Sequence, residues 1–158
     1  MRDRTRRTFT PYEARVADRP LATHPNLDTI VLSGYIPSMA CEVEFTDEFN
    51  VWWEGLNEGE QDDVAAIVGV LEEYGPGLRR PYSGIIKRSK HPNMKELIVQ
   101  HKGEPYRVIY IFDPHRNAIL LLGGNKTGDA RWYEVNVPIA DKIYDEYLKL
   151  IAREGPIR

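Results

Sequence analysis

Apolar residues in the second half of the chain fall into short runs separated by turn-forming residues. Residues 106–112 (YRVIYIF) lead into Asp-Pro-His-Arg-Asn, and residues 118–122 (AILLL) stop at Gly-Gly-Asn. Runs of this length between Gly, Pro, Asn and Asp predict two antiparallel strands joined by a turn. An earlier run, residues 96–101, is followed by Lys-Gly-Glu-Pro. The pattern therefore predicts a three-stranded antiparallel meander.

Residues 46–74 follow helical spacing instead. Thr46 precedes two acids, as expected of a residue that caps a helix N-terminus. The first apolar stripe that follows is Phe49, Trp52, Trp53 and Leu56. Gly59 interrupts the pattern, and the second stripe before Gly-Pro-Gly is Val64, Ile67, Val68, Leu71 and Tyr74. This spacing predicts a helical hairpin with Trp52 and Trp53 in the core or at an interface.

Three further elements complete the predicted fold. Residues 41–45 alternate like a first strand, and residues 82–87 fit a short strand. A final helix is predicted over 137–151, with an apolar stripe of Ile139, Ile143, Tyr147 and Leu150 or Ile151. We therefore expect an α+β domain: an N-terminal strand and a helical hairpin packed on a small antiparallel sheet, with a C-terminal helix.

Residues 1–38 differ from the rest, with four prolines, six arginines and little periodicity apart from a possible isolated strand at residues 29–35. We expect a disordered or loosely attached extension there, or a basic arm that binds nucleic acid, and one domain over residues 39–158. Met39 directly precedes the first predicted strand. We therefore hypothesise that translation starts at Met39 in the native cell, which mass spectrometry of the natively expressed protein would test.

Composition excludes several classes of protein. Cys41 is the only cysteine among 158 residues, so an intrachain disulfide and a four-cysteine zinc site are excluded. No apolar run approaches the roughly 20 residues of a membrane helix, and the N-terminus lacks the apolar core of a signal peptide. We expect a cytoplasmic protein without a membrane segment.

The formal net charge of −3 conceals a strong segregation of charge along the chain. Residues 46–74 carry nine acids and no Lys or Arg. Residues 79–107 carry eight Lys and Arg against two acids, a local excess of 8 − 2 = +6. An acidic helical side and a basic sheet side predict that a polyanion binds one face.

Arg107 is the most informative single residue. It lies inside a predicted strand, where alternation puts it on the same face as Ile109 and Ile111. A charge on an apolar face needs a partner or a ligand. The partner is either an acid of the chain, such as Glu96 or Glu134, or a bound anion.

Residues 123–128 (GGNKTG) do not fit the P-loop pattern, which requires GxxxxGK[ST] followed by a helix. Backbone amides and Lys126 at this strand exit either approach a phosphate or form an ordinary turn. Trp132 and Tyr133 follow side by side. Either both rings pack, or one stacks on an unpaired base while neighbouring side chains bind phosphate.

The histidines His91, His101 and His115 lie ten or more residues apart and have no metal-ligand spacing. We predict no metal site and no cofactor. His101 shares a strand face with Lys95, and it is either a general base, an RNA contact or a structural residue at the end of a strand.

Four motifs, in order, give the chain a family resemblance. They are SKHPNMKEL at residues 89–97, PYRV at 105–108, LLGGNKTG at 121–128 and RWY at 131–133. With the predicted order of strand, helical hairpin, sheet and helix, the chain from about residue 41 to 147 resembles the phage-derived branch of HigB-type toxins in the RelE/ParE superfamily. The resemblance implies a RelE-like fold.

The resemblance also implies a type II toxin that cleaves mRNA in the ribosome without metal, by attack of the ribose 2′-OH on the adjacent phosphate. Arg107 matches the arginine that neutralises that phosphate, Lys126 the cation at the strand exit, and Tyr133 the C-terminal tyrosine that orients groups or transfers a proton. The residues expected to contact RNA are Lys87, Arg88, Lys90, Lys95, His101 and Arg131.

One departure from the family pattern leaves other functions open. Ile98 stands where many relatives carry Arg after Glu-Leu. The alternatives are a ParE-like inhibitor of DNA gyrase and a catalytically inactive module of the same fold that binds RNA or antitoxin. The expected partners are the ribosome, mRNA and a HigA-like helix-turn-helix antitoxin, for which the acidic hairpin offers a separate surface.

Overall fold

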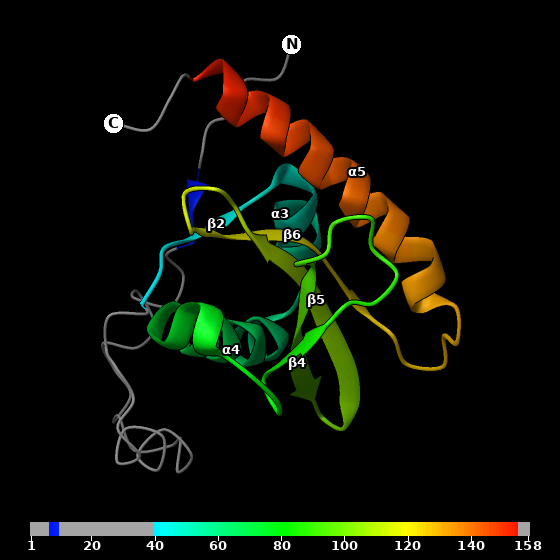
Figure 1. Cartoon of the computed structure of the whole chain (residues 1–158). Helices are drawn as coiled ribbons and strands as arrows, with labels where there is room; N and C mark the ends of the chain where they lie inside the picture. Colours follow the sequence, from blue (N-terminus) through cyan, green and yellow to red (C-terminus); the bar gives the residue numbers. More distant parts are fainter. Residues whose placement is uncertain (1–6, 10–39, 155–158) are drawn as a thin grey trace.

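In the part of the chain that the structure describes, six strands form one mixed sheet with helices on both faces (Figure 1). The computed structural model describes residues 7–9 and 40–154. In spatial order the strands are β1 (Arg7–Thr8), β2 (Val43–Phe45), β6 (Ala118–Asn125), β5 (Glu104–Phe112), β4 (Lys95–His101) and β3 (Ser83–Ile85). β2 pairs in parallel with β6, and the other neighbouring strands are antiparallel. The predicted meander is confirmed.

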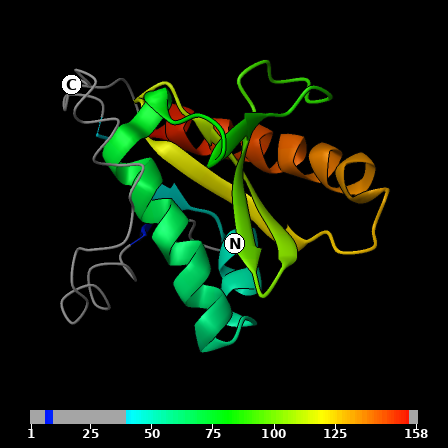
Figure 2. The ribbon, with the colours of Figure 1, turned by 90° about the horizontal axis from the view of Figure 1, so that it is seen from below.

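Helices lie on opposite faces of this sheet (Figures 1 and 2). The helical elements are α3 (Asp47–Glu54), α4 (Glu58–Tyr74), the short 3-10 helix η2 (Gly75–Gly77) and α5 (Trp132–Arg153). One apolar cluster joins α3 and α4 to the sheet and contains Phe49 and Val108. The other joins α5 to the opposite face and contains Ile109 and Ile143. This α+β arrangement is compatible with a RelE-like fold, as predicted.

Side-chain caps explain where the first two helices begin. The Thr46 hydroxyl accepts a hydrogen bond from the Phe49 N–H at 3.2 Å and lies 2.7 Å from the Leu121 carbonyl, to which it donates. Asn57 and Glu60 form a reciprocal capping box at the start of α4. The helix start at Thr46 is confirmed. Gly59 was expected to separate the helices, but it lies inside α4 because the capping box initiates the helix before it.

Helix α5 begins at Trp132 rather than at residue 137, and one residue of its predicted apolar stripe is wrong. Ile139 is 47% exposed, whereas Ala140 beside it is completely buried. The small Ala140 side chain lets the helix approach the sheet closely, so the buried face runs through Ala140 and Ile143 instead. Pro138, inside the helix, made the earlier start hard to predict.

Most of the proposed N-terminal extension lies outside the described residues. Within residues 7–9, Arg7 and Thr8 pair with β2, and the Phe9 N–H donates to the Val43 carbonyl at 2.8 Å. The loose attachment of residues 1–38, the isolated strand at 29–35 and the start at Met39 stay predictions. No helix within the described part of the chain is long and apolar enough to cross a membrane.

Two adjacent glycines at the end of β6 allow tryptophan rings to pack on both faces of the sheet. A Cβ on Gly123 would lie 2.3 Å from the Trp52 ring, and a Cβ on Gly124 would lie 2.7 Å from Trp132 Nε1. The Gly-Gly pair is therefore required by packing, whether or not a phosphate approaches it. The interpretation of Trp52 as a packing residue is confirmed.

A Gly123→Ala variant should lose about 1–3 kcal/mol of unfolding free energy, because Trp52 must leave its position to avoid the new methyl group. Urea denaturation followed by tryptophan fluorescence measures the loss. Gly55→Ala is the control, since its Cβ would meet nothing closer than 3.5 Å and its backbone is already helical. Equal stability of the two variants would contradict this packing argument.

Candidate active site

Arg107 lies on the face of the sheet that α5 covers, opposite Ile98 on one side and Gly124 on the other. Its side chain is only 12% exposed, and Nη1 donates to the Tyr106 carbonyl at 2.9 Å. Ile98 is half-buried here and supplies no second cation to this position. Strand pairing fixes the position of Arg107, and the cover that α5 gives to this face limits the access of water to its side chain.

The Arg107 side chain faces a buried carboxylate. Its Nε lies 3.7 Å from Glu96 Oε2, and the Glu96 side chain is 10% exposed. That distance permits Coulomb attraction but exceeds a hydrogen bond, and among the described residues both atoms are buried without a hydrogen-bond partner. Of the two acids predicted as possible partners, Glu96 makes the ion pair. Two buried polar atoms without partners remain available to a ligand or to a small rearrangement.

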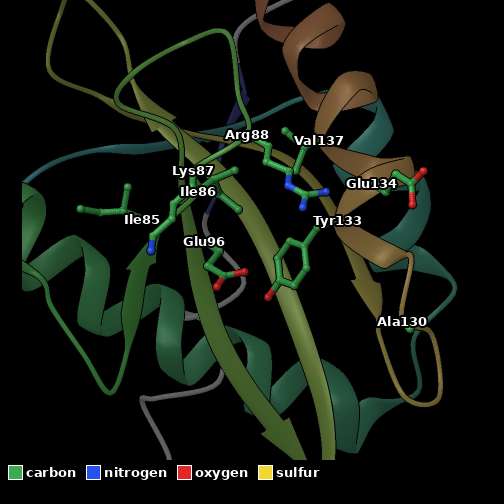
Figure 3. Close-up of a pocket in the computed structure, with 9 residues that line it drawn as sticks. All are labelled: Ile85, Ile86, Lys87, Arg88, Glu96, Ala130, Tyr133, Glu134 and Val137. Atoms are coloured by element: carbon green, nitrogen blue, oxygen red, sulfur yellow. The ribbon is translucent and has the colours of Figure 1, made fainter.

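Tyr133 reaches this pair from the first turn of α5, with its hydroxyl directed toward the Glu96 carboxylate (Figure 3). Burial raises the pKa of Tyr133 above its usual value near 10, and hydrogen bonding to Glu96 adds to the shift. Arg107 acts in the opposite direction on the same pKa. The phenol therefore keeps its proton at neutral pH and can donate it to a ligand.

A cavity of about 440 Å³ opens beside this group. Its walls come from β3, the loop that follows β3, β4 and α5. The lining residues are Ile85, Ile86, Lys87, Arg88, Glu96, Ala130, Tyr133, Glu134 and Val137 (Figure 3). The cavity thus combines aliphatic walls with two cations, two carboxylates and a phenol, so it offers apolar contact together with charged and hydrogen-bonding groups.

Lys126 joins the same neighbourhood through Tyr133. Its Nζ lies 5.2 Å from the centroid of the Tyr133 ring, a cation–π distance, and its backbone N–H donates to the Pro105 carbonyl at 3.0 Å. Arg131 lies at the start of α5, exposed, with Nε 3.1 Å from Glu134 Oε2. The structure thus brings together Arg107, Lys126 and Tyr133.

Lys95 and His101 lie on the other face of the sheet. Lys95 Nζ is 5.5 Å from the Phe112 ring centroid, and burial, followed by the charge of Arg79, lowers the pKa of Lys95. His101 Nδ1 lies 2.6 Å from Asp63 Oδ2 on α4. The sheet separates both residues from Arg107, so the structure does not bring them to the cavity.

Three basic residues of the loop after β3 have different surroundings. Lys87 and Arg88 line the cavity and are exposed. Lys90 forms an ion pair with Asp145 of α5, and the hydrogen bond to that carboxylate raises the pKa of Lys90. Among the described residues, no group of three or more His, Cys, Asp or Glu is placed to hold a metal ion.

Glu96 is the cavity residue to which the sequence analysis assigned no chemical role. The sequence offered one signal, the alternation of side chains along a strand. It places Glu96 on the face of the sheet opposite to the face of Lys95 and Leu97. Its meeting with Arg107 depends on the register, in which Ile98 lies opposite Arg107.

Comparison with known proteins gives the family. The family described as "Phage derived protein Gp49-like (DUF891)" matches residues 51–145, a range that runs from the second half of α3 through α4 and strands β3 to β6 to most of α5. The chain belongs to this family of HigB-type toxins. The predicted resemblance is thereby confirmed, and the matched range contains every residue that lines the cavity of this toxin.

Two relatives of this HigB-type toxin come from Mycobacterium tuberculosis (strain ATCC 25618 / H37Rv). "Putative toxin HigB3" is 42% identical over 98 residues, which cover 61% of this chain and 84% of that protein. "Putative toxin HigB2" is 38% identical over 114 residues, which cover 71% of this chain and 57% of that protein. No solved structure matches the toxin.

Proposed function

We propose that this chain is the toxin of a type II toxin–antitoxin pair and a ribosome-dependent mRNA endoribonuclease that requires no metal. One observation carries the proposal: Arg107, Glu96 and Tyr133 meet beside a cavity whose rim carries Lys87 and Arg88. Cleavage of RNA by its own 2′-OH needs a group that neutralises phosphate charge, a base and an acid, and a cation, a carboxylate and a protonated phenol can fill these three roles.

In the proposed reaction, Glu96 takes the proton from the ribose 2′-OH as the 2′-oxygen attacks the adjacent phosphorus. Arg107 neutralises the charge that develops on the non-bridging oxygens, with Lys126 beside it. As the P–O5′ bond breaks, Tyr133 gives its proton to the leaving 5′-oxygen. The products are a 2′,3′-cyclic phosphate and a free 5′-hydroxyl, and Glu96 and Tyr133 exchange protons with water to return to their starting states.

The basic rim suits an RNA substrate. Lys87 and Arg88 are positioned to neutralise phosphates next to the cleaved one, and exposed Arg131 extends the basic surface beyond the cavity. Base stacking on Tyr133 is a second use for its half-exposed ring. Lys95 and His101 lie on the α4 face of the sheet and take no part in this proposed reaction.

The proposed partners are the ribosome, its mRNA and a helix-turn-helix antitoxin of the HigA type. The acidic surface of α3 and α4 is separate from the cavity, since the sheet lies between them. Val51, which is 74% exposed on α3, gives this acidic surface an apolar contact point. A basic segment of an antitoxin fits such a surface, and we place the pair in the cytoplasm.

Primer extension on an mRNA translated in a purified ribosome system tests the proposed function. The expected result is new cuts within the reading frame that need both the toxin and the ribosome. Intact mRNA at toxin concentrations that stop translation would overturn the proposal. DNA breaks that depend on gyrase would then assign the ParE-like alternative, and an absence of both would assign the inactive binding module.

A Tyr133→Phe variant should cleave about 10²-fold more slowly, because proton donation by a positioned side chain typically contributes this much or more. Since the pKa of Tyr133 is raised above its usual value near 10, the phenol stays protonated as pH rises. The ratio of the wild-type to the variant rate should therefore be constant from about pH 7 to about pH 9. Single-turnover rates measure it, and a ratio that falls toward one across this range argues against Tyr133 as the acid.

A further inference from the structure

The loop between β3 and β4 carries four basic residues that fall into two groups. The loop is closed at its base by the Ile86 N–H, which donates to the Met94 carbonyl at 3.0 Å. Lys87 and Arg88 come first and line the cavity, whereas Lys90 and His91 come next and contact α5. The loop thus runs from residues that line the cavity to residues that contact α5.

Two carboxylates of α5 hold the second half of this loop. Asp141 is 7% exposed and accepts hydrogen bonds from the Ser89 hydroxyl and from the Lys90 N–H at 3.2 Å. One helical turn later, Asp145 pairs with Lys90 Nζ and lies 2.8 Å from His91 Nε2. Residues four apart lie on one side of a helix, so the two acids form a single clamp.

The contacts of the clamp hold the loop in one conformation. The His91 ring also packs edge-on against Tyr144, with ring centroids 4.8 Å apart. Burying the Asp141 carboxylate costs free energy, whereas an apolar side chain at this position would carry no such cost. The hydrogen bonds to Asp141 fix the backbone at Lys90 and the side chain of Ser89, which directly follows Arg88.

The clamp leaves the first two cations of the loop to a ligand. Within residues 7–9 and 40–154, Lys87 and Arg88 make no ion pair, whereas Lys90 forms an ion pair with Asp145 and the His91 ring contacts the same carboxylate. Binding of a phosphate orders the cationic side chain and also the loop that carries it, and both changes cost entropy. Because the clamp already fixes the loop backbone, the second cost is reduced. Because Asp141 and Asp145 hold the second half of the loop while Lys87 and Arg88 stay unpaired, the arrangement favours phosphate binding by Lys87 and Arg88 at the cavity rim.

We propose that Asp141 and Asp145 are positioning residues that clamp the basic loop and set Lys87 and Arg88 over the cavity for the phosphates of an RNA strand. The inference rests on the proposed function for its substrate. It gives Lys90 an anchoring role in place of a direct phosphate contact.

The direction in which Asp141→Asn changes RNA binding tests this proposal. Asp141→Asn changes the formal net charge from −3 to −3 + 1 = −2, which on long-range electrostatics alone strengthens RNA binding. Positioning predicts the opposite. We expect KM for ribosome-bound mRNA to rise about tenfold with kcat within about twofold, as for the loss of a contact that serves substrate and transition state equally.

Controls separate positioning from charge and from folding. Glu42→Gln removes an exposed carboxylate outside the loop and the cavity, so it reports the effect of charge alone. Ser89→Ala removes a hydrogen bond to Asp141 but keeps its charge, and it should raise KM in the same direction as Asp141→Asn. Thermal unfolding of each variant shows whether the domain stays folded at the assay temperature.

A double-mutant cycle decides the mechanism. When Lys87 and Arg88 are both replaced by Ala, adding Asp141→Asn should change KM by less than about twofold, because no cations remain to be positioned. A fully additive effect would overturn the proposal, as would an unchanged or lower KM for Asp141→Asn in the otherwise wild-type toxin. Cleavage by the wild type, in either case, leaves the proposed function standing.

If the wild type cleaves no mRNA, binding still tests the clamp. Fluorescence anisotropy with a single-stranded RNA oligonucleotide gives Kd for the same variants. An increase of about tenfold in Kd for Asp141→Asn that disappears without Lys87 and Arg88 supports the clamp independently of catalysis. Equal Kd values for the wild type and Asp141→Asn would overturn it.

Discussion

An Arg107→Ala variant is expected to cleave mRNA about 10²–10³-fold more slowly than the wild type, the usual consequence of removing one group that stabilises transition-state charge. The guanidinium is 12% exposed and is held by its hydrogen bond to the Tyr106 carbonyl, so its charge is poorly screened and already oriented. Single-turnover cleavage by ribosome-bound toxin measures the rate, and the loss should appear in kcat more than in KM.

A charge-matched control isolates the position of Arg107. Arg153→Ala removes one positive charge from the last turn of α5, and its rate should stay within about threefold of the wild type because weakly placed surface charges contribute little. Arg107→Ala also leaves Glu96 buried without its ion-pair partner, so thermal unfolding must accompany the kinetics. A folded Arg107→Ala protein that still cuts at the wild-type rate would remove Arg107 from the proposed mechanism.

The elements that the sequence predicted well are those whose signals are local. Thr46 caps α3 through a residue three positions away, and the strand β5 ends where Asp113 accepts hydrogen bonds from the His115 and Asn117 backbones in the following turn. Such contacts depend only on neighbouring residues, so composition and spacing carry them. Family membership followed from motifs within the same elements, and the comparisons confirmed it.

The parts that could not be predicted depend on contacts between distant segments. The short strand β1 exists because Arg7 and Thr8 find β2 across more than thirty residues of sequence, and nothing near Arg7 signals this pairing. The phase of α5 was misjudged at Ile139 because the approach of Ala140 to the sheet decides which side of the helix is buried. Tertiary packing overrides a helical stripe that is apolar on more than one side.

In the candidate site, too, the sequence predicted what depends on neighbouring residues and missed what depends on contacts between distant segments. Alternation along β4 could place Lys95 and His101 on one face and Glu96 on the other, but only the register between β4 and β5 shows which face Arg107 shares. The sequence therefore contained the cations and the tyrosine as candidates without separating them by face. It named Glu96 only as a possible partner for Arg107, since a role in catalysis requires the cavity and Tyr133 beside it.

A Glu96→Gln variant is expected to lose about 10²–10⁴-fold in kcat, the range typical of removing a positioned general base. Gln has nearly the volume of Glu, so the packing around Gly84 and Tyr133 is retained while the proton acceptor is removed. The variant also frees the Arg107 guanidinium from the only carboxylate described beside it, and KM should stay constant or fall because Arg107 then binds phosphate more strongly. Single-turnover rates over a range of toxin concentrations give both constants.

Two further substitutions distinguish a base from a charge that merely balances Arg107. Glu96→Asp keeps a carboxylate but shortens its reach by one methylene, so it should recover part of the lost kcat. Glu134→Gln alters the other carboxylate at the cavity, which is 56% exposed and paired with Arg131, and its kcat should stay within about threefold of the wild type. If Glu96→Gln and Glu134→Gln slow the reaction equally, the two acids act only through the local field, and a different group must accept the proton of the 2′-OH.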